Sequence, residues 1–394
     1  MAQFSSGCIA GTLVLDASRV LAGPFAGQLL GDHGADVIKV ESFDGDDTRG
    51  YGPPFVEGTA PYFMGLNRNK RDLALDLSGP DGIGLLFEML EHVDVFIENF
   101  KLSTWKKWGV DDLSELTRRF PRLVHCRVSG FGETGQYGGL PGYDAALQAM
   151  SGLMAVNGPL DIDACRIGIP IVDTCTGMYG CIGILLALLE RNRSGRGQQV
   201  EVTLYDTALA MLHPHVSNVL YGGKASRTGN GHPNIVPYDL FPTATVPLFL
   251  AVGNDRQFRT LCTELGMAAF GTDLRYRTNG DRVVNRDSLR AALLPVLSNE
   301  DGMVLFKRLM QLGVPCAPVL SVDEALALDH TATREMVAEL DGYRGAGVSV
   351  KLDRTPGSVR LPPPDIGEHS REVLMRFGLD ADRIDRLVDA SIVK

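Results

Sequence analysis

The chain has 394 residues and a formal net charge of -10, with 44% hydrophobic and 22% charged residues. This composition is ordinary for a soluble globular protein, and the length allows two or three domain-sized cores. The acidic balance argues against a nucleic-acid-binding protein, whose domain would usually be basic, but a local basic patch could still hold an anionic ligand.

Targeting and redox signals favour a cytoplasmic protein outside the membrane. The first 20 residues lack the basic and long apolar regions of a signal peptide. The longest apolar run, residues 181–189, is too short to span a bilayer. The chain has 7 cysteines and no CxxC pair, which favours free thiols in a reducing compartment over a disulfide framework.

The first 132 residues alternate strand-like and helical segments. Strands are expected at 12–18, 35–41, 94–100 and 123–132, and helices at 25–34, 79–93 and 112–121. Such alternation predicts a mainly parallel sheet with helices on its faces. Ligands in sheets of this kind bind beyond the carboxyl ends of the strands.

The next segments complete a large domain. A helix is expected at 143–156, a short strand-like segment at 168–173, a buried helix at 176–193 that is apolar nearly all round, and extended chain at 200–206. Beyond 206 the periodicity fades, as is typical of a connection.

A second style of sequence begins near residue 231. The patterns predict a hairpin at 238–255, helices at 255–266, 286–297 and 301–313, a strand pair at 336–361, and a last helix from Arg371. The expected organisation is a large α/β domain over 1–205, a connection at 206–230, a smaller α/β domain over 231–325, and a C-terminal segment, 326–394, that returns to the large domain.

Several familiar site motifs are missing from the sequence. It has no glycine-rich phosphate loop, no HExxH, no clustered Cys/His spacing and no GxSxG. His213, His215 and His232 share no acidic or cysteine partner at ligand spacing, so we expect no metal site. Nucleotide-dependent hydride transfer, P-loop chemistry, zinc hydrolysis and serine esterase chemistry are all disfavoured.

Asp173 lies between the strand-like segment and the buried helix. An aspartate there would ordinarily cap the helix through its side chain. The same position also suits catalysis, because a helix N-terminus favours an ionised carboxylate, which can attack a thioester and form a covalent intermediate. The local sequence leaves both interpretations open.

Two basic segments follow expected elements. One is Asn67–Arg71, and the other is Asn99–Lys107, which contains three lysines and Trp105. Both could be solvated loops. Both could also bind a ligand that needs point charges for phosphates and an aromatic ring for a base, as coenzyme A does.

Segments spread over the whole chain together resemble the class III CoA-transferases of the formyl-CoA transferase type. The matching segments are LDASRVLAGPFAGQLLGDHGADVIKVE (15–41), GDDTRGYGPPF (45–55), NRNKR (67–71), VFIENF (95–100), VSGFGETG (128–135), GYDAALQAMSGLM (142–154), PIVDTCTGMYG (170–180), GRGQQVEVTLYDTAL (195–209) and GVPCAPV (313–319). Within that family, GDDTRGYGPPF, NIVPYDLF and VGNDRQFRTLC are most similar to the succinate–hydroxymethylglutarate (glutarate) CoA-transferases.

The resemblance implies an interlocked homodimer, each chain with a Rossmann-like large domain and a smaller domain. It implies transfer of CoA from a donor acyl-CoA, with succinyl-CoA as a candidate, to a short carboxylic or dicarboxylic acid. CoA thioesters would then be substrates, with no permanently bound cofactor. The family's catalytic aspartate falls on Asp173, with Asp144 and Tyr143 as possible support. Its CoA contacts fall on Leu21, Ala22, Leu66, Asn69, Lys70, Asn99, Phe100, Lys101 and Lys107.

Three further points bear on the reaction. Many relatives carry arginine at the positions of Ser42 and Lys107, and lysine lacks the bidentate fork of arginine. The related α-methylacyl-CoA racemases use a histidine where this chain has Tyr143, and an unperturbed tyrosine is a poor acid–base group near neutrality. Racemase or epimerase activity is therefore the alternative, and a non-catalytic acyl-CoA-binding protein is a third. Arg19, Arg49 and His232 are candidates for holding a distal carboxylate.

Overall fold

The computed structural model describes residues 7–159 and 161–394, and these fall into two compact units. Unit 1 contains the chain up to Gly152, then Ile167–Pro214 and Asp329–Lys394. Unit 2 contains Leu153–Arg166 and His215–Leu328.

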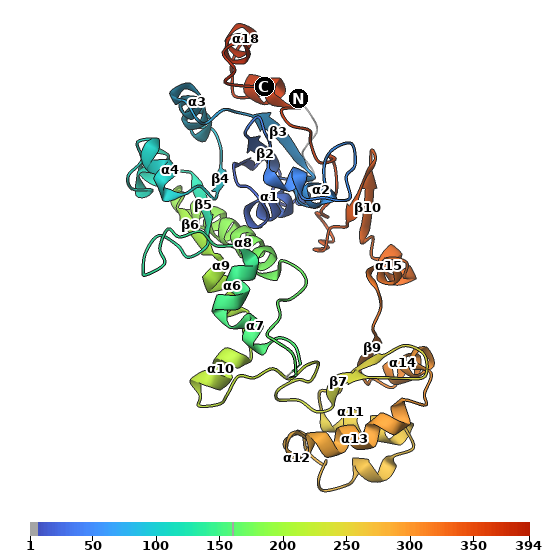
Figure 1. The fold of residues 1–394 in the computed structure, drawn as a ribbon. Coiled ribbons are helices and arrows are strands. Elements are labelled where there is room, and N and C mark those ends of the chain that lie inside the picture. The colour runs from blue at the N-terminus through green and yellow to red at the C-terminus, as the bar shows by residue number, and fades with distance from the viewer. Residues whose placement is uncertain (1–6, 160) are drawn as a thin grey trace. The chain divides into compact units, whose positions relative to one another are not determined.

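A parallel sheet forms the centre of unit 1 (Figure 1). Its six strands lie in the order β3-β2-β1-β4-β5-β6. This is the strand order of a Rossmann fold, so the expected α/β large domain with a Rossmann-like sheet is confirmed. The strands are β1 (Leu13–Asp16), β2 (Asp36–Glu41), β3 (Lys70–Ala74), β4 (Val95–Glu98), β5 (Val124–Ser129) and β6 (Gln199–Thr203).

Helices cover both faces of this sheet, because its strands are apolar on both sides. Along β1, Leu13 and Leu15 belong to one core cluster, while Val14 belongs to the other. The helical elements of unit 1 are α1 (Ala22–Asp32), η1 (Asp47–Gly50), α2 (Pro61–Asn67), α3 (Pro80–Leu90), α4 (Leu102–Lys107), α5 (Ser114–Arg119), α6 (Asp144–Ser151), α8 (Ile171–Ser194), α9 (Leu204–Ala210), α16 (Asp329–Thr333), α17 (Ser370–Arg376) and α18 (Ala381–Asp389).

Helices α1 and α8 pack closely at their N-terminal turns. A Cβ atom added to Gly177 would lie 2.6 Å from the carbonyl oxygen of Ala22, so only glycine permits this approach. Farther along, Ala26 and Leu30 of α1 share a buried cluster with Ile184 and Ala187 of α8. The packing places the first turn of α8 beside the loop that follows β1.

By length and composition, α8 could also cross a bilayer. Its Ile184 and Ala187 lie in the core of unit 1, and core helices of globular proteins meet the same criterion.

Unit 2 contains an antiparallel sheet in the order β7-β8-β9, with β7 (Tyr238–Phe241), β8 (Leu248–Ala251) and β9 (Cys316–Pro318). The expected hairpin is therefore present as β7 and β8. The sheet shares one apolar cluster with Phe258, Leu293 and Leu305 of three helices. The helical elements of unit 2 are α7 (Leu153–Val156), α10 (His215–Leu220), α11 (Asp255–Glu264), η2 (Ala268–Gly271), α12 (Asn279–Val284), α13 (Arg286–Leu297), α14 (Gly302–Gln311) and α15 (Val322–Leu326).

Four local expectations need correction. The helix expected at 143–156 is interrupted at Gly152, whose φ of 97° ends α6 in the left-handed region. The strand-like segment expected at 168–173 gives way to α8 at Ile171. Part of Asn67–Arg71 belongs to strand β3. The C-terminal helix ends at Arg376, and α18 follows it. The expected strand pair in the tail is β10 (Val337–Leu340) with β11 (Tyr343–Ala346).

Candidate active site

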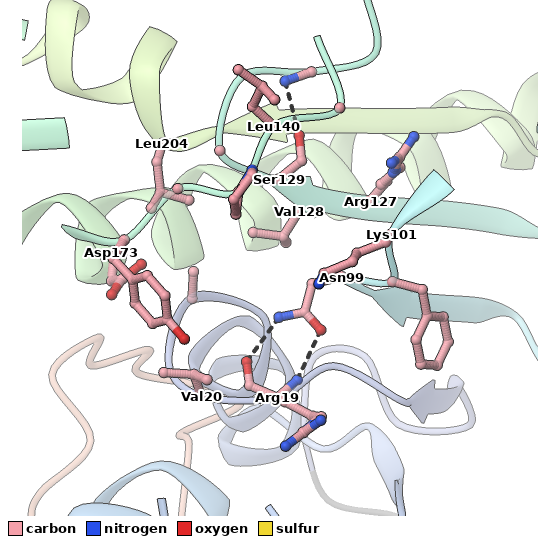
Figure 2. A pocket seen from close by; sticks show the side chains of 18 of the residues that line it. Arg19, Val20, Asn99, Lys101, Arg127, Val128, Ser129, Leu140, Asp173 and Leu204 are labelled. Atoms are coloured by element: carbon pink, nitrogen blue, oxygen red, sulfur yellow. Dashed lines mark hydrogen bonds between the residues drawn. The ribbon is translucent and has the colours of Figure 1, made fainter. Parts of the chain in front are cut away.

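A cavity of about 310 Å³ opens at the carboxyl ends of β1, β4 and β5 in unit 1 (Figure 2). The strand order reverses between β1 and β4, which is where open α/β sheets bind ligands. The loops after these three strands line it, together with the end of β5, α8 and α9, through residues 19–22, 99–102, 127–130, 132, 139–143, Asp173 and Leu204.

Asn99 joins two of these loops. Its Oδ1 accepts a hydrogen bond from the backbone N–H of Arg19 at 3.1 Å, and its Nδ2 donates to the carbonyl oxygen of Arg19 at 2.9 Å (Figure 2). One amide side chain thereby fixes the loop after β4 to the loop after β1.

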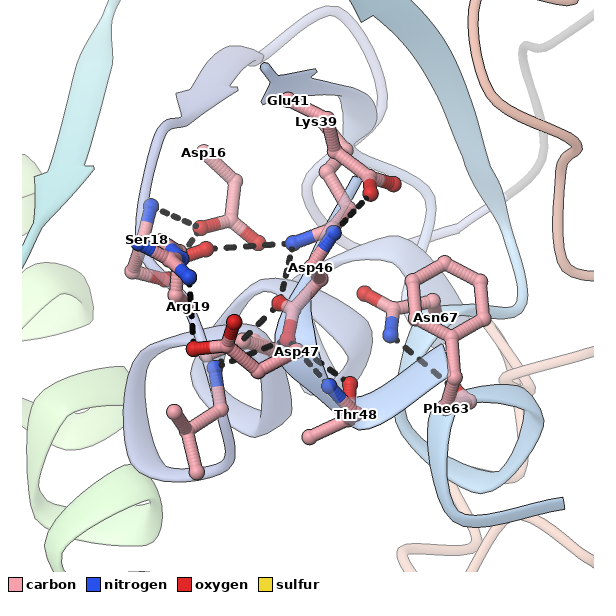
Figure 3. Close-up of polar contacts among 12 residues, drawn as sticks. Asp16, Ser18, Arg19, Lys39, Glu41, Asp46, Asp47, Thr48, Phe63 and Asn67 are labelled. Atoms are coloured by element: carbon pink, nitrogen blue, oxygen red, sulfur yellow. Dashed lines mark hydrogen bonds and ion pairs between the residues drawn. The ribbon is translucent and has the colours of Figure 1, made fainter. Parts of the chain in front are cut away.

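A buried polar cluster lies beneath the loop after β1 and consists of Asp16, Ser18, Lys39, Asp46 and Lys70. Figure 3 shows the first four of these residues. The Nζ atom of Lys39 lies 3.0 Å from Asp46 Oδ2, and Lys70 Nζ lies 2.8 Å from Asp16 Oδ2. Although burial opposes the charge of Lys39, the carboxylates around it raise its pKa to about 12. For Lys70 burial outweighs Asp16 and lowers the pKa to about 8.

The cluster also holds a strained part of the pocket wall. Val20 has a φ of 74°, which is costly for a β-branched residue. Its backbone N–H donates to Asp46 Oδ2 at 3.2 Å. Because Val20 lines the cavity, the ion pair of Asp46 and Lys39 stabilises the shape of the site as well as the core.

The cavity brings together some of the predicted CoA-binding residues and not others. Its lining includes Leu21, Ala22, Asn99, Phe100 and Lys101. The remaining four residues, Leu66, Asn69, Lys70 and Lys107, are not part of that lining.

The segment Asn67–Arg71 is not a solvated loop, because all five residues are buried. The Nζ atom of Lys70 donates to Asn67 Oδ1 and to the carbonyl oxygen of Pro24 at 2.8 Å each, in addition to its ion pair with Asp16. The Nδ2 atom of Asn69 donates to Asp32 Oδ1 at 2.8 Å. The charges of this segment were visible in the sequence, but their partners lie far away along the chain.

Trp105 does not offer an exposed ring for a base either. It is 1% exposed, and it packs against Phe96 and His125. In contrast to Trp105, the nearby lysines Lys101 and Lys107 are both exposed to solvent.

Asp173 is the third residue of α8, and its side chain does not cap that helix. The expectation of a side-chain cap is therefore wrong. The residue at the cap position is Pro170, which has no side-chain acceptor. Instead, Asp144 Oδ2 accepts hydrogen bonds from the backbone N–H groups of Val172 at 2.7 Å and Asp173 at 3.1 Å.

The surroundings of Asp173 perturb its ionisation. Burial, together with the negative charge of Asp144, raises the pKa of Asp173 to about 7. Burial and then the charge of Asp173 raise the pKa of Tyr62 to about 12. The rings of Tyr62 and Tyr51 meet edge to face, 5.5 Å between centroids. The site therefore holds one partly buried carboxylate that ionises near neutrality, which suits a nucleophile or a base.

The three candidates for a distal carboxylate fall in different places. Arg19 lines the cavity and pairs with Asp47 at 2.5 Å. Arg49 is buried, and its guanidinium is held by Glu41 at 2.7 Å and by the carbonyl oxygen of Pro364. His232 belongs to unit 2.

Sequence reasoning missed two residues of the site. Arg127 lines the cavity, is 2% exposed and pairs with Glu133. Gln148 is fully buried and binds Asp144. An arginine inside an apolar strand was the available signal for Arg127, whereas nothing local distinguishes Gln148 from any glutamine on a helix. In residues 7–159 and 161–394, no group of His, Cys, Asp and Glu side chains could hold a metal ion.

Comparison with known proteins identifies the class. The model of CoA-transferase family III matches residues 9–370, and the chain belongs to this family. It is therefore a CoA-transferase, as its motifs predicted.

Individual relatives agree along nearly the whole chain. It is 39% identical to the succinate–glutarate CoA-transferase of Agrobacterium fabrum, over 93% of this chain and 94% of that one. It is 34% identical to the succinyl-CoA:glutarate CoA-transferase of Homo sapiens, over 97% and 89%. A crystal structure of a CaiB/BaiF family protein from Brucella suis matches with a TM-score of 0.83 at 37% identity, covering 94% of this chain and 100% of that one.

Proposed function

We propose that the protein transfers CoA from succinyl-CoA to a short dicarboxylic acid through covalent intermediates on Asp173. One observation carries the proposal: within the described part of the chain, Asp173 is the only carboxylate that lines the cavity at the sheet's switch point. The names of the relatives from Agrobacterium fabrum and Homo sapiens support a dicarboxylate acceptor.

The reaction needs no external proton or electron carrier. An oxygen of Asp173 attacks the thioester carbon of the donor, the C–S bond breaks, and CoA leaves as a thiolate, which gives a mixed anhydride. The thiolate then attacks the Asp173 carbonyl carbon, which releases the donor acid and forms the aspartyl-CoA thioester. The acceptor carboxylate repeats these steps in reverse and leaves as its CoA ester, and Asp173 is again a free carboxylate.

We place the CoA moiety along the residues that line the cavity. Leu21 and Ala22 supply backbone at the N-terminus of α1, and Asn99–Lys101 supply the neighbouring loop after β4. The exposed ammonium groups of Lys101 and Lys107 are available for phosphate groups. We place Leu66, Asn69 and Lys70 next to CoA only through main-chain atoms and the side chain of Leu66, because the side chains of Asn69 and Lys70 are engaged inside the unit.

We further propose a cytoplasmic homodimer. Helix α8 leaves an apolar face exposed through Ile182, Leu185, Leu186 and Leu189, which are 38–63% exposed. Such a face on a soluble protein marks an interaction surface. All 7 cysteines are free, which fits a reducing compartment.

An exchange assay with chemical trapping tests the function. Enzyme, succinyl-CoA and a panel of free acids such as glutarate are mixed, and the aspartyl-CoA thioester is trapped with hydroxylamine or borohydride. We expect Asp173→Ala to abolish both exchange and trapping. Asp206→Ala is a matched control, because Asp206 is also the third residue of its helix, α9, but is exposed and outside the cavity lining.

Two outcomes would contradict the proposal. Exchange at the wild-type rate by Asp173→Ala would exclude it as the nucleophile. Incorporation of solvent deuterium at the α-carbon of a branched acyl-CoA, without any acceptor acid, would instead indicate the racemase activity considered from the sequence.

A further inference from the structure

The first turn of α8 is capped by a residue from another helix. A helix leaves its first N–H groups without partners inside the helix, and a side chain at the cap position usually accepts from one of them. Here Pro170 stands at that position. The carboxylate of Asp144, the first residue of α6, accepts from the N–H groups of both Val172 and Asp173.

Asp144 is itself held firmly. It is 8% exposed, and its second oxygen, Oδ1, accepts from Gln148 Nε2 at 2.5 Å. The Oε1 atom of Gln148 accepts the backbone N–H of Ile167 at 2.8 Å. Two residues one turn apart on α6 thus bind both ends of the segment that leads into Asp173.

We infer that Asp144 is the positioning residue of the nucleophile. By capping α8 from α6, it leaves the carboxylate of Asp173 free in the cavity. It also holds its own negative charge at a fixed place beside that carboxylate. An aspartate at the third position of a helix would otherwise turn its carboxylate back to the free N–H groups. The inference rests on the proposed role of Asp173 as nucleophile.

The neighbouring charge has a chemical consequence. The free carboxylate of Asp173 is repelled by Asp144, whereas the anhydride and the aspartyl-CoA thioester carry no charge on that side chain. Asp144 therefore raises the free energy of the resting carboxylate relative to both covalent states. Burial is the larger cause of the raised pKa of Asp173, about 7, and the charge of Asp144 raises it further, which is the sign that this arrangement requires.

Other groups near Asp173 are neutral or lie on other parts of the cavity. The charged or titratable groups that interact with it or share its cavity are Asp144 of α6, Tyr62 of α2, Tyr143 before α6, Arg19 after β1, Lys101 after β4 and Arg127 of β5. Cys175 lies on α8 itself, and burial followed by Asp144 raises its pKa. Asp144 is the acid among these neighbours, so removal of its charge is the specific test.

The experiment compares the pH profile of kcat/KM for CoA exchange in wild type and Asp144→Asn. Asparagine keeps the size of the side chain and an oxygen that can accept the two N–H groups, but it removes the charge. We expect the acid limb of the profile to move to lower pH by about one unit. At pH 8, the ratio of trapped aspartyl-CoA thioester to free enzyme should fall by about tenfold.

Matched variants separate positioning from general damage. Glu190→Gln removes one charge from the exposed C-terminal part of the same helix and should leave the profile unchanged. Asp144→Glu keeps the charge and should keep the wild-type acid limb, even if kcat falls. If Asp144→Asn does not fold, Asp144→Ser serves as a second neutral variant with the same expected shift.

An unshifted acid limb in a folded neutral variant, with normal trapping, would overturn the inference. That result remains distinct from failure of the proposed function, which would appear as exchange by Asp173→Ala. If Asp173→Ala is inactive and Asp144→Asn keeps the wild-type profile, Asp173 is the nucleophile but Asp144 does not set its state.

Discussion

Asp46 and Asp173 of unit 1 both lie near Val20 in the loop after β1, but their neighbours carry opposite charges. Asp46 lies 3.0 Å from the Lys39 ammonium and also accepts hydrogen bonds from Thr48. These partners outweigh the effect of burial and lower its pKa. For Asp173, burial together with the like charge of its neighbour Asp144 raises the pKa to about 7.

The difference separates a carboxylate that stabilises the fold from one that is available for reaction. A charge inside a protein is tolerated when it is paired and hydrogen-bonded, and it becomes reactive when it is not. Val20 connects the two environments, because its N–H donates to Asp46 while its side chain lines the cavity with Asp173. The fixed charges of the buried polar cluster thus define the wall beside the reactive carboxylate.

The largest expected effect comes from breaking the buried polar cluster. Lys70→Met removes the ammonium that lies 2.8 Å from Asp16, and both side chains are fully buried. Because the carboxylate would remain without its cation, we expect the free energy of unfolding to fall by about 3–5 kcal/mol. Urea unfolding at pH 7 measures the change.

A companion variant checks the physical reason. Asp16→Leu combined with Lys70→Met removes both charges, so it should recover much of the stability lost in Lys70→Met alone. Equal losses in the single and double variants would show that packing, rather than the unpaired carboxylate, causes the effect.

Asp173→Asn should raise the free energy of unfolding, whereas Lys70→Met should lower it. The pKa of Asp173 is about 7 in the folded chain and 3.8 for an unperturbed aspartate, so the folded state binds more protons between these pH values. Wild-type stability is therefore lost as pH rises from 4 towards 7, whereas the asparagine variant lacks that loss. We expect Asp173→Asn to be more stable at pH 8 by roughly 2 kcal/mol, with little difference near pH 4.

Thermal or urea unfolding across this pH range measures the gain. A constant difference between the two proteins at every pH would indicate a packing effect instead. Loss of exchange activity together with a gain in stability would show directly that the carboxylate needed for activity destabilises the folded protein.

The contrast between apolar segments and buried paired charges also explains which strands could be predicted from the sequence. Strands β1, β2, β4 and β5 were predicted because their apolar runs face helices on both sides. Strand β3 was missed, because its sequence begins with Lys70, Arg71 and Asp72 and reads as a polar loop. Its charges become tolerable only through partners such as Asp16, 54 positions away in the sequence.

The site shows a similar division. Family motifs pointed to Asp173, and the resemblance also placed Asp144 nearby. The start of α8 was misplaced because its capping carboxylate lies 28 residues before Val172, beyond any local pattern. Ion-pair partners and tertiary caps are chosen by the three-dimensional packing, so a single sequence does not reveal them.

Asn99→Ala tests the hydrogen bonds between uncharged groups that join the loop after β4 to the loop after β1. The variant removes the two hydrogen bonds to the backbone of Arg19, and the position is half-buried. We expect a loss of about 1 kcal/mol in unfolding free energy, because such neutral bonds contribute modestly. The KM for acyl-CoA should rise more clearly than stability falls, since both loops line the cavity. Asn299→Ala, at an exposed helix end in unit 2, is a control whose KM should be unchanged.

Arg19→Gln should have the smallest effect on stability. The side chains of Arg19 and Asp47 are 51% and 53% exposed, and exposed ion pairs of this kind contribute less than about 1 kcal/mol. Yet Arg19 lines the cavity, and its positive charge is available to an anionic ligand. Steady-state kinetics at low and high salt separate the two roles: the KM for acyl-CoA should rise most at low salt, because added ions screen the charge in the wild type. A KM that stays at the wild-type value at every salt concentration would show that Arg19 belongs with the stabilising charges around Asp46 rather than with the reactive site. Val20 would then separate the two groups of charges, because its backbone N–H donates to Asp46 of the buried polar cluster and its side chain lines the cavity.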